Sequence, residues 1–141
     1  MNYWKYLLLT GIVLQVGMAR AQGTLTLEVK GLKQETGALY IALYNKPEGF
    51  READAAYKKL IAPVKGNPAV VDLGGLPAGT YAVTLFHDEN DNGELDTNMM
   101  GIPKEGYGFS NNPKIRFGPP DFGECTFTHG DAAQTVSVQI Q

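Results

Sequence analysis

The amino-acid sequence predicts an all-β fold in which two antiparallel sheets, with about seven strands in total, pack face to face. Three observations lead to this prediction. Short segments alternate between apolar and polar residues with a period of two, turn residues separate these segments, and helical periodicity occurs in one segment only. A chain of 141 residues, 43% of them hydrophobic, is long enough for one domain with a packed core.

The first 21 residues are predicted to be a secretory signal peptide. They contain one base, Lys5, then an apolar run over residues 7–14, and they end on the small-x-small triplet Ala19-Arg20-Ala21. The apolar run is too short to cross a bilayer, which takes about 20 residues. We therefore expect cleavage after Ala21 and export to the periplasm or the extracellular space, with an uncleaved anchor as the alternative. Residues 22–141 would then form a single β-sandwich domain without a membrane span.

The charge of this mature domain excludes two classes of partner. Once Lys5 and Arg20 are removed, 10 basic residues remain against 15 acidic ones, a net charge of −5. Nucleic acids and anionic lipids attract clustered Lys and Arg, so neither is expected as a partner.

Cys125 is the only cysteine, which leaves the domain without an internal disulfide. We expect it to be a buried, unreactive strand residue, because Glu124 beside it opposes formation of the thiolate.

Period-two alternation places strands along most of the chain. The segment 24–30 has one wet face, whereas 38–44 is apolar on both faces and suits a central strand that can carry its tyrosines outward. From Phe50 to Leu60 the apolar residues recur with helical spacing, which predicts one short helix near 51–60. Further strands are expected at 60–65, 69–73, 81–87, 125–129 and 135–141, the last two forming a closing pair across residues 130–133.

The turn before the strand at 81–87 has a distinctive pattern. Pro77 fixes one turn dihedral, Gly79 permits a positive φ, and Tyr81 is placed to pack its ring inward while its hydroxyl caps nearby backbone. The string from Gly75 to Val83 resembles the strand entry of transthyretin-like and collagen-adhesin B-type sandwich modules. This resemblance implies an immunoglobulin-like or transthyretin-like sandwich and implies nothing about activity.

The segment after this strand has the composition of a calcium-binding loop. Residues 88–96 contain five acids and no Lys or Arg, so their charges repel one another unless a cation relieves them. Alternating oxygen ligands with a glycine at the sixth position are typical of loops that bind calcium. The predicted ligands are Asp88, Asn90, Asn92, the backbone carbonyl of Glu94, and Asp96.

This loop departs from the helix-loop-helix calcium hand in two ways. A strand precedes it, and Met99 stands at the twelfth position, where a bidentate glutamate normally closes the site. Because calcium takes about six to eight oxygens, water, Asn98 or Glu105 would have to complete the shell. A plain polar turn is the alternative, since Asp, Asn and Gly are the commonest turn residues.

A long irregular loop is expected over residues 97–123, where the sequence has no clear periodicity. Its aromatic side chains either staple the loop to the sandwich or form a recognition surface for a protein, peptide or glycan. The aromatic residues concerned are Tyr107, Phe109, Phe117 and Phe122.

Three motifs, in this order and spacing, resemble those of one bacterial family. They are the turn at 76–82, the acidic run at 87–96 and the segment from Gly101 to Asn112. Together they resemble the domain-of-unknown-function family 2141 over nearly the whole mature chain. The resemblance implies an exported bacterial sandwich domain without an assigned biochemical role, so it adds no activity to the interpretation.

Three functions are compatible with the sequence. The first is a non-enzymatic exported module whose calcium loop orders the adjacent aromatic loop for recognition or for structural use. The second is a small-ligand carrier or receptor that uses the aromatic loop and a sheet face as a pocket. The third, a hydrolase built on His87, His129 and Ser110, is disfavoured because no motif places these residues together and His87 and Asp88 point to opposite strand faces.

Overall fold

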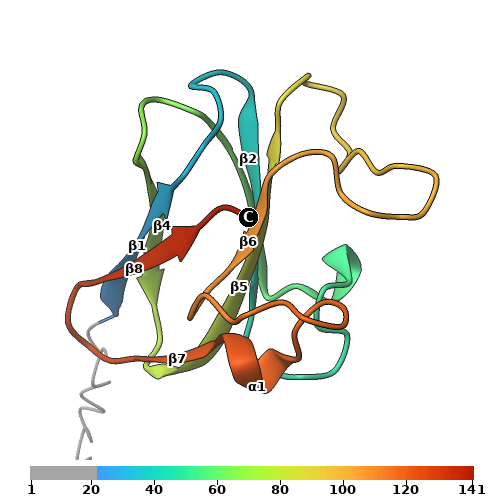
Figure 1. The fold of residues 1–141 in the computed structure, drawn as a ribbon. Helices are drawn as coiled ribbons and strands as arrows, with labels where there is room; N and C mark the ends of the chain where they lie inside the picture. Colours follow the sequence, from blue (N-terminus) through green and yellow to red (C-terminus); the bar gives the residue numbers. More distant parts are fainter. Residues whose placement is uncertain (1–21) are drawn as a thin grey trace, which may run out of the picture.

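The structure, a computed structural model, describes residues 22–141, so the predicted signal peptide lies outside the described residues. Two sheets pack face to face (Figure 1), one with strand order β4-β1-β8 and the other with order β3-β2-β5-β6, in which β7 also pairs with β5. This arrangement confirms the predicted all-β sandwich. Within this part of the chain, no helix is long and apolar enough to cross a membrane. The elements are β1 (Gly23–Lys30), β2 (Ala38–Tyr44), η1 (Ala53–Ala55), β3 (Lys58–Pro63), β4 (Ala69–Leu76), β5 (Gly79–Asp88), β6 (Tyr107–Phe109), α1 (Phe122–Cys125), β7 (Thr126–His129) and β8 (Gln134–Gln139).

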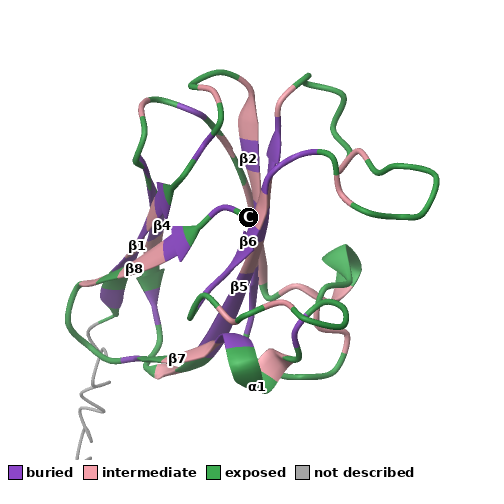
Figure 2. Ribbon diagram, in the orientation of Figure 1, coloured by how far each residue is buried: buried purple, intermediate pink, exposed green. Residues whose placement is uncertain are grey.

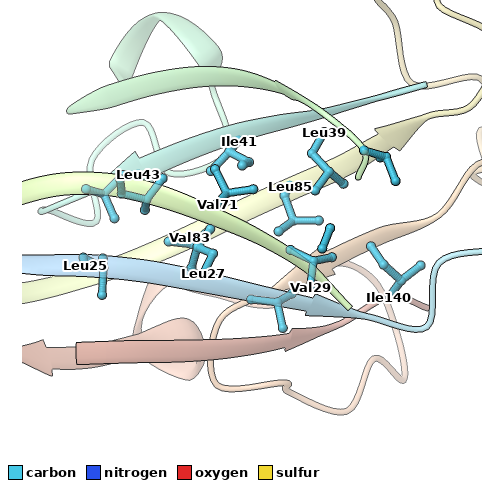
Figure 3. Packing of buried hydrophobic residues seen from close by; sticks show 14 of the residues in the cluster. Leu25, Leu27, Val29, Leu39, Ile41, Leu43, Val71, Val83, Leu85 and Ile140 are labelled. Atoms are coloured by element: carbon cyan, nitrogen blue, oxygen red, sulfur yellow. The ribbon is translucent and has the colours of Figure 1, made fainter. Parts of the chain in front are cut away.

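The core lies between the two sheets and follows from the period-two pattern of the sequence. In β1, Leu25, Leu27 and Val29 are fully buried, while the residues between them point away from the core. Each buried aliphatic side chain contributes about 1.5–3 kcal/mol, so the interior stabilises the fold without a disulfide. Figure 3 shows side chains of both sheets meeting here, with Leu39, Ile41, Leu43, Val83 and Leu85 on the larger sheet and Leu25, Leu27, Val29 and Val71 on the smaller one.

The last two strands join different sheets, which corrects the predicted closing pair. β7 pairs antiparallel with β5, whereas β8 pairs parallel with β1, from Leu25 opposite Gln134 to Lys30 opposite Gln139. The connection at residues 130–133 therefore crosses from one sheet to the other and does not turn a hairpin. Among the described strands, eight in number, this is the one parallel pair.

The segment predicted as one short helix near 51–60 contains a single 3-10 turn, η1, followed by β3. Gly49 and Arg51 have positive φ angles of 71° and 75°, and this left-handed backbone interrupts a helix before it begins. From Lys58 onward the residues alternate along β3, with Leu60 turned toward the core. The helical spacing of apolar residues thus arises from a turn that leads into a strand.

The segment 97–123 is more regular than predicted, because β6 lies within it. Tyr107 pairs opposite Phe86 and Phe109 opposite Thr84 in the register with β5. Gly108 faces β8, where an added Cβ atom would lie 2.7 Å from Val138 Cγ1. Glycine is therefore required for β6 to approach β8 this closely.

The tyrosine at the start of β5 behaves as the sequence predicts. Tyr81 is 4% exposed, and its hydroxyl donates a 2.8 Å hydrogen bond to the carbonyl oxygen of Pro77. Burial raises the pKa of this phenol above its ordinary value of 10.0. The contact fixes the turn between β4 and β5, and so sets where β5 begins.

Candidate ligand groove and acidic loop

The outer face of the larger sheet carries a groove whose floor is set by strand register. One row of side chains across β3, β2, β5 and β6 consists of Ile61, Tyr40, Phe86 and Tyr107, and the next row consists of Lys59, Ala42, Thr84 and Phe109. The Tyr40 and Phe86 rings stack with centroids 4.9 Å apart and planes 10° apart. Because Ala42 and Thr84 are small, the second row forms a hollow beside this flat aromatic pair.

Two groups of loops project from the outer side of the larger sheet (Figure 1), and residues from both groups line the groove. The loop after β5 contributes Leu95, Ile102 and Pro103, and the segments around η1 and before α1 contribute Ala53 and Ile115, among others. The groove encloses about 840 Å³. The loops that carry these residues are largely exposed (Figure 2), and within them Met99 and Phe117 are fully exposed at 105% and 103%.

Positive charge is confined to one end of the groove. Within the described part of the chain, Arg51 and Lys59 are the only charged residues that line it. Lys59 Nζ lies 3.8 Å from Asp54 Oδ1, and Asp54 is fully exposed, so water screens this pair strongly. Arg51 forms no ion pair with any described residue.

The predicted calcium ligands lie together in the loop after β5. Asp88 is 1% exposed, and its carboxylate accepts hydrogen bonds from the backbone N–H groups of Asn92 (3.2 Å) and Gly93 (2.8 Å). The side-chain amides of Asn90 and Asn92 both donate to the Asp96 carboxylate, over 2.7 and 3.0 Å. Gly93 has a φ of 80°, as the sixth position of such a loop requires.

The hydrogen bonds of this cluster fill the place that a cation would take. The amide nitrogens of Asn90 and Asn92 face Asp96, so binding calcium would require both amides to turn their oxygens inward. Glu94 enters only through its backbone, whose N–H donates to Asn92 Oδ1 over 2.9 Å. In residues 22–141, no group of three or more His, Cys, Asp and Glu side chains is close enough to hold a metal. The loop thus offers two carboxylates and two amides as its side-chain ligands.

The two residues expected to complete a calcium shell have other contacts. Glu105 is 6% exposed and joins the two ends of the acidic loop, accepting the N–H of Glu89 (2.8 Å) and the N–H of Asp96 (3.0 Å). Asn98 caps its own turn, accepting the N–H groups of Met100 and Ile102. Glu105 therefore holds the loop shape independently of any bound ion.

The acidic loop and the groove share a wall. Leu95, between the acidic residues 94 and 96, lines the groove, and a Cβ atom on Gly93 would lie 3.4 Å from the Tyr40 hydroxyl. Tyr40 therefore reaches from the groove floor to the turn of the loop. A change in the loop backbone would therefore move Tyr40, which forms part of the groove floor.

The four aromatic residues predicted for recognition are divided between three places. Tyr107 and Phe109 line the groove, Phe117 lies exposed beside it, and Phe122 packs edge-on against Phe50 with centroids 5.5 Å apart. Phe122 is thus stapled to the sandwich, while recognition of a partner by the other three stays a prediction. The sequence interpretation did not identify the floor residues Tyr40, Ala42 and Phe86, although the outward-facing tyrosines of 38–44 were the available signal.

The residues considered for a hydrolase are held in separate structural roles. His87 is fully buried, with Nε2 2.6 Å from the carbonyl oxygen of Thr36, and its Nδ1 has no partner among the described residues. The ring of His129 lies between Gly23 and Gln134, at 2.9 and 3.0 Å from their oxygens.

The remaining candidate nucleophiles are also buried. Ser110 Oγ accepts the N–H of Val83 over 2.8 Å and donates to the Cys125 carbonyl. Cys125 itself ends α1 and does not lie on a strand as predicted. Burial, with a smaller contribution from Glu124, raises the pKa of its thiol to about 12, so the thiol stays protonated near neutral pH.

One family matches most of the chain. It is described as an uncharacterized protein conserved in bacteria, DUF2141, and the match covers residues 27–137. The chain belongs to this family. DUF2141 membership is what the three sequence motifs predicted, and the matched range runs from β1 into β8 and includes the groove and the acidic loop. No curated protein and no solved structure matches the chain.

Proposed function

We propose that this DUF2141 chain is an exported, non-enzymatic binding module that holds a small apolar molecule on the outer face of its larger sheet. The observation that carries the proposal is the groove of about 840 Å³ over the stacked Tyr40 and Phe86. Pockets for small organic ligands enclose about 300–1,000 Å³ and are lined mainly by apolar and aromatic side chains.

The test is a fluorescence titration with N-phenyl-1-naphthylamine, an uncharged apolar probe whose emission rises in dry surroundings. The parent chain should bind it saturably, and Ala42→Phe should abolish binding because the new ring fills the hollow beside Phe86. Val70→Phe is the matched control, since Val70 is 67% exposed on β4 of the other sheet. Ala42→Leu, a smaller insertion, should weaken binding less. Equal binding by all four chains would overturn the groove assignment.

A second candidate function, calcium binding by the acidic loop, is supported by the cluster of Asp88, Asn90, Asn92 and Asp96. Four side chains with oxygen atoms meet there around a left-handed glycine, which is a hard donor set that suits calcium better than zinc or copper. Calcium would draw the amide oxygens inward and fix the loop that carries Leu95. Through this wall, the bound ion would set the shape of the groove.

Calorimetric titration of calcium into chelator-treated protein tests this second function. Asp96→Asn should remove binding, while Asp91→Asn removes the same charge from an exposed residue of the same loop and should leave binding intact. Calcium should also change the affinity for N-phenyl-1-naphthylamine in the parent chain but not in Asp96→Asn. If millimolar calcium produces no heat, the loop is a polar turn and not a calcium site.

Export is proposed from the leader-like composition of residues 1–21. When the full-length chain is made in a bacterial host, the mass of the product purified from the periplasm or medium should correspond to a chain that begins at Gln22. A product that retains Met1 and stays with the membrane would instead support an uncleaved anchor.

A further inference from the structure

The distribution of charge along the groove indicates more than a general affinity for apolar molecules. Arg51 and Lys59 line the end beside η1, and among the described lining residues there is no Asp or Glu. The opposite end is walled by Leu95, Ile102 and Pro103, in a loop that carries acids at 94 and 96. A bound molecule therefore meets positive charge at one end and an apolar wall backed by negative charge at the other.

Arg51 has a backbone conformation that its residue type does not favour. Its φ of 75° lies in the left-handed region, and the other described non-glycine residues with positive φ are Asp91, Asn111 and Asn112. Asp and Asn tolerate this conformation, whereas for most other residues it is sterically unfavourable. A ligand that binds the guanidinium would explain why an arginine, and not a glycine, stands at this position.

We propose that the ligand of the groove is an amphipathic organic anion, with a flat apolar body and one acidic head group. The body lies over the Tyr40 and Phe86 pair, and the carboxylate or sulfonate of the head accepts hydrogen bonds from Arg51 and Lys59. The apolar end points toward Leu95 and Ile102. This inference rests on the proposed function of the groove and adds the chemical class of the ligand and its orientation.

Both cations are available for such a contact. Arg51 has no ion-pair partner among the described residues, and Lys59 has only the exposed carboxylate of Asp54. Since exposed pairs of this kind contribute little to stability, an acidic head group displaces Asp54 at little cost. A guanidinium also binds a carboxylate or sulfonate with two parallel N–H donors, which fixes the direction of the ligand.

The test compares two probes that share one ring system. N-phenyl-1-naphthylamine is uncharged, and 8-anilinonaphthalene-1-sulfonate carries one sulfonate on the same rings. The double variant Arg51→Gln/Lys59→Gln should weaken binding of the sulfonate probe about tenfold more than binding of the uncharged probe. Lys46→Gln/Lys65→Gln removes the same charge at exposed residues outside the groove and should affect neither probe. Added salt should weaken only the sulfonate probe.

The outcomes separate the two proposals. If Ala42→Phe abolishes binding of both probes but the Arg51→Gln/Lys59→Gln variant binds the sulfonate as the parent does, the groove is confirmed and the anionic class is overturned. If Ala42→Phe leaves both probes bound, or neither probe binds the parent, the groove function fails and the anion inference fails with it. Thermal unfolding of every variant checks that the fold is retained.

Discussion

At the scale of single residues, the buried polar side chains of this domain have structural roles. Ser110 and Cys125 are linked by a hydrogen bond from the hydroxyl to a backbone carbonyl, and both side chains are fully buried. The thiol is therefore a packing group whose protonation state depends on folding. The Nε2 atom of His87 is similarly engaged by a backbone group, the carbonyl oxygen of Thr36.

The raised pKa of Cys125 predicts a loss of stability at alkaline pH. In the unfolded chain the thiol loses its proton near its ordinary pKa of 9.0, whereas in the folded chain it keeps the proton up to about pH 12. The free energy of unfolding should therefore fall as pH rises through this window, and the contribution is fully present below pH 9. Denaturant titrations at several pH values should show a shallower decline for Cys125→Ala. Buried Tyr44 and Tyr81, whose pKa values are also raised by burial, contribute to the slope in the same direction.

At the scale of elements, β6 connects the groove to the smaller sheet. Its outward residues, Tyr107 and Phe109, line the groove, while its inward Gly108 lies against β8. The C-terminal Gln141 adds a backbone hydrogen bond from its N–H to the Tyr107 carbonyl, at 2.9 Å. A three-residue strand thus holds one side of the groove floor in place.

Gly108→Ala should destabilise the domain because its Cβ would lie 2.7 Å from Val138 Cγ1 and 3.1 Å from the carbonyl oxygen of Gln139. Overpacking of this kind costs about 1–3 kcal/mol. Gly123→Ala is the matched control, since nothing lies within 4 Å of its added carbon. Thermal or denaturant unfolding measures the difference between the two variants. Equal stabilities would mean that β6 is not packed against β8 as described.

The elements that sequence patterns identified best are the locally determined ones. Alternation in 24–30 and the apolar run in 38–44 predicted strands β1 and β2, and the acidic loop was recognisable because its Asp, Asn and Gly residues lie within nine positions of the sequence. The parallel pairing of β8 was not predictable, because a period of two is the same for parallel and antiparallel partners. The groove was not predicted either, because the hollow over Ala42 depends on which residues of four neighbouring strands lie side by side.

At the scale of the whole molecule, stability should differ strongly between the two sides of the larger sheet. β1, β2 and β5 each have a strand on both sides and lie against the common core. The walls of the groove, by contrast, are loops with exposed tips (Figure 2). Ligand-binding segments are generally drawn from the less stable parts of a fold.

Hydrogen exchange of the native protein should follow this division. Amides of β1, β2 and β5 should exchange most slowly, at rates set by global unfolding, and those of residues 89–104 most rapidly. Mass spectrometry of peptic fragments measures both groups in one experiment. Calcium, if it binds, should slow exchange in 89–104 and leave the three strands unchanged. Protection of β3 above that of β2 would contradict the observed strand order.

The parallel pairing of β1 with β8 also has a kinetic consequence. Leu25 stands opposite Gln134, so more than 100 residues separate the partners that complete the smaller sheet. Contacts between residues so far apart in sequence slow folding, because a long chain segment must be closed before the contact stabilises anything. During synthesis, β1 is made first and has no neighbour on one side until β8 follows. The smaller sheet can therefore form in full only after β8 has been synthesised.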